Sequence, residues 1–327
     1  MASSPDTPEP HRFWTVRFGW IVPLICGALV GVALRLFFSG TPGKPYQAMM
    51  SSFTLLVPIL VGAVTVYMAE RAARRSWAYY FFAVANALFV IGTMVIRVEG
   101  LICAVLAVPL FGLVGGLGGI LMGAVCRWTK WPRPAIYSFA ALPLLLGGLE
   151  QNLALPQDIR SVERVRTISA SPEAIWTHLT VAKDIRSDEI GTAWMYRIGV
   201  PLPLSAVTVL ADGTQVRHIT MGKGIRFDQI AADWQPNRRV RWTYRFANDS
   251  FPSGALDDHV RIGGRYFDVI DTEYVLRKVN AGTELRVTMR YRVSTAFNWY
   301  TQPIAEFLVG NFEEAALRFY AIRAEKR

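Results

Sequence analysis

Residues 285–293 read LRVTMRYRV and alternate strictly between apolar and polar side chains. Residues 240–246, VRWTYRF, show the same alternation. Because successive side chains of a β-strand point to opposite faces, both stretches predict half-buried strands. Arginine and threonine occupy the second face, as expected for the solvent side of an antiparallel sheet. The second half of the chain is therefore predicted to contain such a sheet.

Further strands and two helices are predicted around this pair. The strands lie at 162–168, 216–221, 225–234 and 266–278. A short helix should follow Ser171, which suits an N-cap, with Pro172 at the first helical position. The last 25 or so residues predict a long helix, because apolar residues recur every three or four positions along it. These residues are Ile304, Leu308, Phe312, Ala315, Phe319 and Ile322.

Four segments resemble the START-like superfamily, also called SRPBCC, of the polyketide cyclase/dehydrase and lipid-transport type. They are VRTISASPEAIWTHLT at 165–180, IRFDQIAADWQPNRRVRWTYRF at 225–246, YFDVIDTEYVLRKVNAGTELRVTMRYRV at 266–293 and NFEEAALRFYAIRAEKR at 311–327. The helix start SPEAIW and the pattern W-x-P-x-x-R-x-x-W at 234–242 are specific only in combination. The resemblance implies an α+β helix-grip fold, in which a curved antiparallel sheet surrounds the long C-terminal helix. It also implies a hydrophobic cavity between them.

Aromatic and methionine side chains on the expected inner faces are the candidate ligand-binding residues, because such side chains line apolar binding sites. They are Trp242, Tyr244, Phe246, Tyr274, Met289, Tyr291, Phe307 and Phe312. The same residues would also suit a solid core, and the sequence leaves both readings open. Residues 188–211 fit the family pattern least and are expected to form an apolar loop at the cavity mouth or at a membrane surface.

The polar residues predict no catalytic residue, no metal site and no cofactor. His178, His218 and His259 lack the spacing of metal ligands. His218 could face inward from its strand, where a structural role is favoured over a catalytic one. Four strand acids are expected to pair with arginines on the solvated face: Asp228, Asp268, Asp271 and Glu273 with Arg241, Arg245, Arg290 and Arg292. The chain also lacks a nucleophile elbow.

The first half of the chain is predicted to be a transmembrane domain. Between residues 13 and 149 the only acids are Glu70 and Glu99, and a helix needs roughly 20 apolar residues to cross a bilayer. Four spans are expected at Trp14–Phe38, Met49–Met68, Trp77–Ile96 and Leu101–Val125, and a weaker fifth at Ala135–Leu149. The expected organisation is a polar tail at 1–12, a transmembrane domain at 13–150, a linker at 151–160 and a START-like domain at 161–327.

Lysine and arginine predict the orientation. Eight of these residues fall on the side of the N-terminus and three on the other side, so we expect a cytoplasmic N-terminus in a plasma or inner membrane. Five spans place the START-like domain outside the cytoplasm, and four keep it inside. The five-span topology is favoured. The net charge of +10 includes no basic run of the kind that binds nucleic acid.

Glycines in the fourth predicted span are spaced for close helix packing and could also contact a second membrane protein. They are Gly112, Gly116, Gly119 and Gly123. Together these features predict a membrane-anchored protein that binds a lipid or another hydrophobic small molecule. Two alternatives remain: a cyclase- or hydrolase-type enzyme acting on an apolar substrate, and a non-catalytic regulator or assembly partner of another membrane protein.

Overall fold

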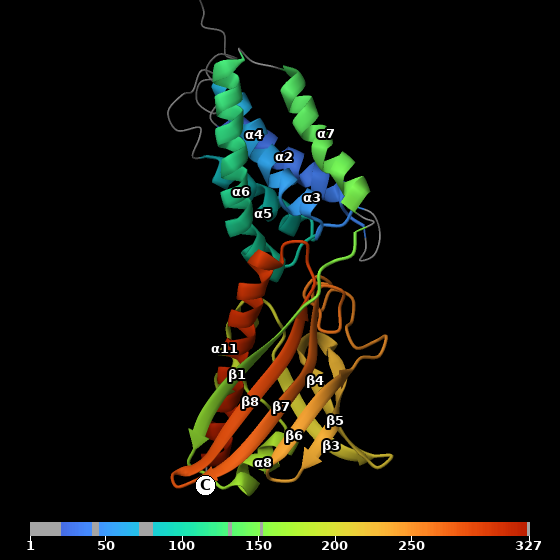
Figure 1. The fold of residues 1–327 in the computed structure, drawn as a ribbon, viewed down its shortest axis with the longest axis vertical. Coiled ribbons are helices and arrows are strands. Elements are labelled where there is room, and N and C mark those ends of the chain that lie inside the picture. Colours follow the sequence, from blue (N-terminus) through green and yellow to red (C-terminus); the bar gives the residue numbers. More distant parts are fainter. Residues whose placement is uncertain (1–20, 41–45, 72–80, 130–132, 151–152, 326–327) are drawn as a thin grey trace, which may run out of the picture. The chain divides into compact units, whose positions relative to one another are not determined.

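The computed structural model describes residues 21–40, 46–71, 81–129, 133–150 and 153–325 (Figure 1). They form two compact units. The first comprises Met1–Glu99 and Ala104–Leu153, and the second comprises Gly100–Cys103 and Ala154–Arg327. The predicted tail at 1–12, and parts of the first, third and fifth predicted spans, lie outside the residues whose side chains the structure describes.

The first unit is helical throughout its described elements. These are α2 (Ile21–Phe37), α3 (Ser51–Thr54), α4 (Leu56–Arg71), α5 (Phe81–Val95), α6 (Leu101–Trp128) and α7 (Arg133–Glu150). Two helical stretches, Ser51–Glu70 and Leu101–Trp128, are long and apolar enough to cross a membrane. The same length and composition occur in buried helices of soluble proteins. These two helices alone therefore do not establish the predicted domain of four or five spans.

The glycines of α6 pack this helix against others of the same unit. A Cβ added to Gly115 would meet the Asn86 side chain and the Pro58 carbonyl oxygen, and one added to Gly118 would meet the Ile59 backbone. Pro58 and Ile59 belong to α4, and Asn86 belongs to α5. Of the glycines predicted to face a partner, Gly116, Gly119 and Gly123 are buried and Gly112 is half-buried. Gly115 and Gly118 therefore allow close packing within the unit, and the contact of a second membrane protein with Gly112, Gly116, Gly119 and Gly123 stays a prediction.

The second unit is built on one antiparallel sheet of eight strands in the order β1-β8-β7-β6-β5-β4-β3-β2. Its strands are β1 (Asp158–Ile168), β2 (Val181–Ala182), β3 (Pro203–Ala211), β4 (Thr214–Met221), β5 (Arg226–Gln235), β6 (Arg239–Arg245), β7 (Phe267–Val279) and β8 (Gly282–Val293). Strands β2 to β8 follow one another in sequence across the sheet, and β1 returns to pair with β8.

The two alternating stretches form strands as predicted. In β8 the residues Leu285, Val287, Met289 and Tyr291 are buried, and Arg290 between them is exposed. In β6 the side chains of Val240 and Trp242 are likewise buried. The apolar face of the sheet therefore points inward, and the face that carries arginine points to solvent.

The long C-terminal helix α11 (Asn298–Glu325) closes the inner face. It packs against β1 and β8, as Figure 1 shows, and against the short helices α8 (Pro172–Thr180), α9 (Ser187–Ile190) and α10 (Trp194–Arg197). Ser171 caps α8, because its hydroxyl accepts a hydrogen bond from the Ala174 amide. A curved antiparallel sheet around one long helix is the helix-grip architecture that the sequence predicts.

Two boundaries differ from the prediction. Strand β1 begins at Asp158, inside the predicted linker at 151–160, because it pairs with β8 from Val293 onward. The predicted loop at 188–211 instead contains most of α9, all of α10 and the strand β3. Strand β3 pairs with β4 over almost its full length, with one irregularity between Pro203 and Ser205.

Candidate functional site

Most of the predicted ligand-binding residues lie between the sheet and α11. Trp242 and Tyr291 are fully buried, with 0% of each side chain exposed, and Tyr274 and Met289 are buried beside them. Tyr244 and Phe312 are half-buried and pack against the same interior. Phe246 is half-buried in a separate apolar cluster around Ile225, Phe227 and Ala255. Phe307 is 56% exposed and does not join the others.

A charged residue, Arg217, lies among these aromatic side chains. The sequence reasoning did not select it as a ligand-binding residue. It lies on β4, and only 5% of it is exposed. Its guanidinium lies 5.8 Å from the centre of the Trp242 ring. One guanidinium nitrogen donates to the Tyr320 hydroxyl over 3.2 Å, and another donates weakly to the Gln229 amide oxygen over 3.5 Å. These contacts place a positive charge in the interior of the grip.

Arg217 has no carboxylate partner among the residues that the structure describes, and its Nε has no hydrogen-bond partner there. Burial acts to lower the pKa of the guanidinium, but its contact with Tyr320 outweighs burial and the net direction is upward, so Arg217 keeps its charge. Burial also raises the pKa of Tyr274 well above its usual value. Because that phenol stays neutral, it does not balance the charge of Arg217.

A second buried polar group, the carboxyl of Glu313, lies on the inner face of α11. Glu313 is 0% exposed, and neither of its carboxyl oxygens has a hydrogen-bond partner among the described residues. Burial raises the pKa of this carboxyl to about 8. Farther along the helix, the Gln302 amide donates to the Tyr291 hydroxyl over 3.1 Å. Across the sheet, the hydroxyls of Tyr244 and Thr272 lie 2.7 Å apart.

His218 does not face inward. Its side chain is 55% exposed, and its Nδ1 lies 2.7 Å from an Asp228 carboxylate oxygen, which also places Asp228 on the outer face. The neighbouring Arg217 takes the inward position, because adjacent strand residues point to opposite faces. Arg217, Ile219 and Met221 are each two positions apart and therefore share one face of the strand. The two apolar residues on this face were the signal that could have identified Arg217.

Three of the four strand acids form ion pairs with arginines, so the predicted pairing is confirmed in part. Asp228 pairs with Arg245 over 2.8 Å, and Asp271 pairs with Arg290 over 2.5 Å. Two details differ. Glu273 pairs with Arg239 rather than with Arg241. Asp268 accepts a hydrogen bond from the Gly263 amide, while Arg292 donates to the carbonyl oxygens of Gly264 and Arg265.

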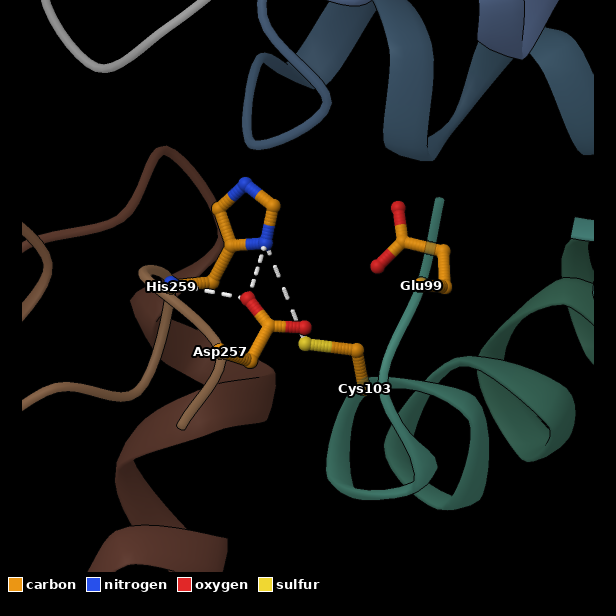
Figure 2. A group of neighbouring side chains, drawn as sticks. All are labelled: Glu99, Cys103, Asp257 and His259. Atoms are coloured by element: carbon orange, nitrogen blue, oxygen red, sulfur yellow. Dashed lines mark hydrogen bonds and ion pairs between the residues drawn. The ribbon is translucent and has the colours of Figure 1, made fainter. Parts of the chain in front are cut away.

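His259 belongs to a separate small group. Its Nδ1 lies 2.9 Å from an Asp257 carboxylate oxygen, and the Asp257 side chain also accepts from the His259 amide (Figure 2). Cys103, which belongs to the same compact unit, has its sulfur 3.9 Å from the same imidazole nitrogen. Burial raises the pKa of Asp257 and the His259 partner lowers it by more, so Asp257 is held ionised. His259 therefore has a carboxylate partner.

No protein-family model matches the chain, and no curated protein matches it. Solved structures with similar folds include the Zhui aromatase/cyclase from Streptomyces sp. R1128, which is 16% identical and has a TM-score of 0.34 over 52% of this chain and 96% of its own. The di-domain aromatase/cyclase StfQ from the steffimycin pathway is 10% identical, with a TM-score of 0.33 over 59% of this chain and 60% of its own.

Norcoclaurine synthase from Thalictrum flavum, solved with dopamine and hydroxybenzaldehyde, is 11% identical. Its TM-score is 0.31 over 52% of this chain and 90% of its own. These neighbours include aromatase/cyclases, this synthase and proteins of unknown function, matched over about half of this chain. At these scores they carry no argument about what this chain binds.

Proposed function

We propose that the C-terminal unit binds a long-chain hydrophobic molecule with an anionic end, such as a fatty acid, between the sheet and α11. One observation carries this proposal: Arg217 is buried and charged, and no carboxylate of the described residues pairs with it. A buried charge without a counter-ion costs several kcal/mol of folding free energy. An anionic ligand would remove that cost when it binds.

The chemistry of the surroundings fits such a ligand. A guanidinium binds a carboxylate or phosphate through two parallel hydrogen bonds, and the Nε of Arg217 has no competing partner among the described residues. Apolar and aromatic side chains of β6, β7 and β8, such as Trp242 and Met289, would contact the hydrocarbon part of the ligand. Arg217 would therefore select the head group, and the apolar side chains would bind the chain.

In this proposal the helices of the first unit anchor the protein in a membrane, with Ser51–Glu70 and Leu101–Trp128 as spans. Anchoring would hold the binding unit close to a store of hydrophobic molecules and would raise their effective concentration. The placement of the binding unit outside the cytoplasm belongs to this proposal as well, and it depends on whether α7 spans.

The test compares two probes of equal chain length. The full-length protein, purified in a mild detergent, is titrated with stearate and with stearyl alcohol, and binding is read as displacement of a fluorescent fatty acid. Because a hydrogen bond to a charged group contributes about 1.5–3 kcal/mol, stearate should bind at least about tenfold more tightly. Equal affinity for the acid and the alcohol, or no binding of either, would refute the proposal.

One observation keeps an enzyme as the second candidate. Glu313 is a buried carboxyl whose pKa of about 8 lies close to neutral pH, which is the range that suits general acid–base catalysis. The two candidates differ in what happens to a bound molecule. A ligand recovered after incubation with unchanged mass and retention time would identify a binding protein, and a changed ligand would identify an enzyme.

A further inference from the structure

Helix α11 presents a row of three buried polar side chains to the sheet: Gln302, Glu313 and Tyr320. Glu313 and Tyr320 are seven positions apart, which is about two helical turns and about 10 Å along the axis. Gln302 lies eleven positions before Glu313, about three turns away, on the same side of the helix. The side chains therefore follow one line along the interior face of α11.

Only the two ends of this row have partners on the sheet among the described residues. Tyr320 accepts a hydrogen bond from Arg217, and Gln302 donates one to Tyr291. Glu313, between them, is completely buried, and neither of its carboxyl oxygens makes a hydrogen bond of normal geometry to a described residue. The Met289 backbone comes close enough only to lower the pKa of this carboxyl slightly, so the carboxyl still lacks a full partner. Buried polar groups almost always have a partner, because leaving one without costs about 1–3 kcal/mol. The lone carboxyl therefore points to a partner outside the chain.

The environment of Glu313 sets its chemical form. Burial is the main cause that raises its pKa to about 8. Among the described residues, the charged groups that act on it are Arg164, which lowers the pKa, and Glu163, which raises it, both from β1. From β8 the Met289 backbone also lowers it, and no charged group acts from α8, α9 or α10. At neutral pH the carboxyl is thus mostly protonated, and it carries one O–H donor.

We propose that Glu313 is a second ligand-binding group, whose carboxyl O–H donates to a neutral acceptor oxygen in the middle of the same ligand that Arg217 holds by its anionic end. The inference rests on the proposed function and names the ligand class more closely. Because Glu313 lies about 10 Å along the helix from Tyr320, the partner of Arg217, the acceptor should lie part-way along the chain. The expected ligand is a long-chain acid with a mid-chain carbonyl group.

The test uses the full-length protein and two acids of equal length, stearate and a mid-chain oxostearate. The ketone oxygen only accepts hydrogen bonds, so it requires a donor on the protein. At pH 7 the oxostearate should bind about tenfold more tightly than stearate, the ratio that corresponds to one hydrogen bond of ~1.4 kcal/mol. This preference should disappear as the pH rises above about 8, because the ionised carboxylate has no proton to donate.

Two variants separate the hydrogen bond from a packing effect. Glu313→Gln keeps an N–H donor of similar size, so it should retain the preference for oxostearate and lose the pH dependence. Glu313→Leu removes the donor and leaves an apolar side chain in an apolar site. It should bind both acids with the affinity that the unchanged protein shows for stearate.

The outcomes are distinct. A wild-type protein that binds stearate and oxostearate equally well overturns this inference and leaves the proposed function standing. The same follows if Glu313→Leu keeps the full preference. If the wild-type protein binds neither acid, the proposed function fails and this inference fails with it. A preference that is present in the wild type, lost in Glu313→Leu and kept in Glu313→Gln supports it.

Discussion

The guanidinium of Arg217 donates to the hydroxyl of Tyr320 over 3.2 Å, and this bond joins strand β4 to helix α11 across the interior of the grip. The two residues are 103 positions apart in the chain. Their contact couples the sheet to the helix at the point where the proposed head-group site lies. It also gives the buried guanidinium one of its few polar partners.

Tyr320→Phe should destabilise the C-terminal unit by about 1–3 kcal/mol, because it leaves one more N–H of the buried Arg217 without a partner. The free energy of unfolding is measured from tryptophan fluorescence in denaturant. The double variant with Arg217→Met provides the control. Once the guanidinium is gone, loss of the Tyr320 hydroxyl should lower the free energy of unfolding much less. An equal loss in the wild-type and Arg217→Met backgrounds would show that the bond does not stabilise the fold.

Acid should weaken the attachment of α9 to α11. Arg323 donates two hydrogen bonds to Glu189, over 3.0 and 2.8 Å, and is the main cause that lowers the pKa of Glu189 from 4.5 to about 2. A carboxyl with a lowered pKa in the folded state stabilises the fold above its unfolded pKa. The contribution is therefore full above pH 4.5 and is lost as the pH falls towards about 2.

The measurement is the unfolding temperature as a function of pH in this range. Arg323→Met should flatten the part of the curve that belongs to Glu189, because the carboxyl then keeps a more ordinary pKa. An unchanged acid dependence in Arg323→Met would contradict the assignment.

Gly282→Ala should destabilise the turn between β7 and β8 by more than about 3 kcal/mol, because both strain and a steric clash arise. Gly282 has φ +130°, and an added Cβ would collide with the Ile168 carbonyl oxygen. Gly213→Ala is the matched control. Gly213 has φ +75°, and beyond its two chain neighbours no residue comes within 4 Å of the added Cβ, so that substitution should cost only about 1 kcal/mol of backbone strain. Similar losses of unfolding free energy in both variants would show that the clash is relieved.

The side of the membrane on which the C-terminal unit lies can be tested with one introduced cysteine. The three native cysteines, Cys26, Cys103 and Cys126, all precede residue 154. Asp249 is exposed, so Asp249→Cys gives a reactive thiol in the C-terminal unit. With five spans it should react with a membrane-impermeant maleimide in intact spheroplasts more strongly than the unchanged protein does. Labelling that requires lysis of the cells would place the unit in the cytoplasm.

Local patterns were enough to predict most of the sheet. Residues 240–246 and 285–293 alternate because one face is buried, and the structure places β6 and β8 there. Strand β3 was missed because its apolar side chains are not confined to one buried face. Leu204, Val209 and Leu210 are all exposed, so the stretch 188–211 has no period-two signal. Its strand forms through pairing with β4, which a local pattern does not encode.

The candidate site was predicted only in its apolar part. Trp242, Met289 and Tyr291 are buried where the strand pattern placed them. Arg217 and Glu313 were missed, because arginine and glutamate are usually solvent-exposed and their burial depends on which elements meet in three dimensions. Arg217 lies two positions before Ile219 and so on the same strand face, which was a local signal. Glu313 lies off the apolar stripe predicted for α11, on the face of the buried Val309, Ala316 and Tyr320.

The most direct test of the account is the affinity of Arg217→Met for stearate and stearyl alcohol, measured on the full-length protein. Arg286→Met, which removes a partly exposed arginine from the outer face of β8, is the matched control. We predict that Arg217→Met folds, binds the alcohol as before and loses about tenfold or more in affinity for stearate, whereas Arg286→Met binds both probes normally. If Arg217→Met instead binds stearate as tightly as the unchanged protein, the buried guanidinium is not the head-group site.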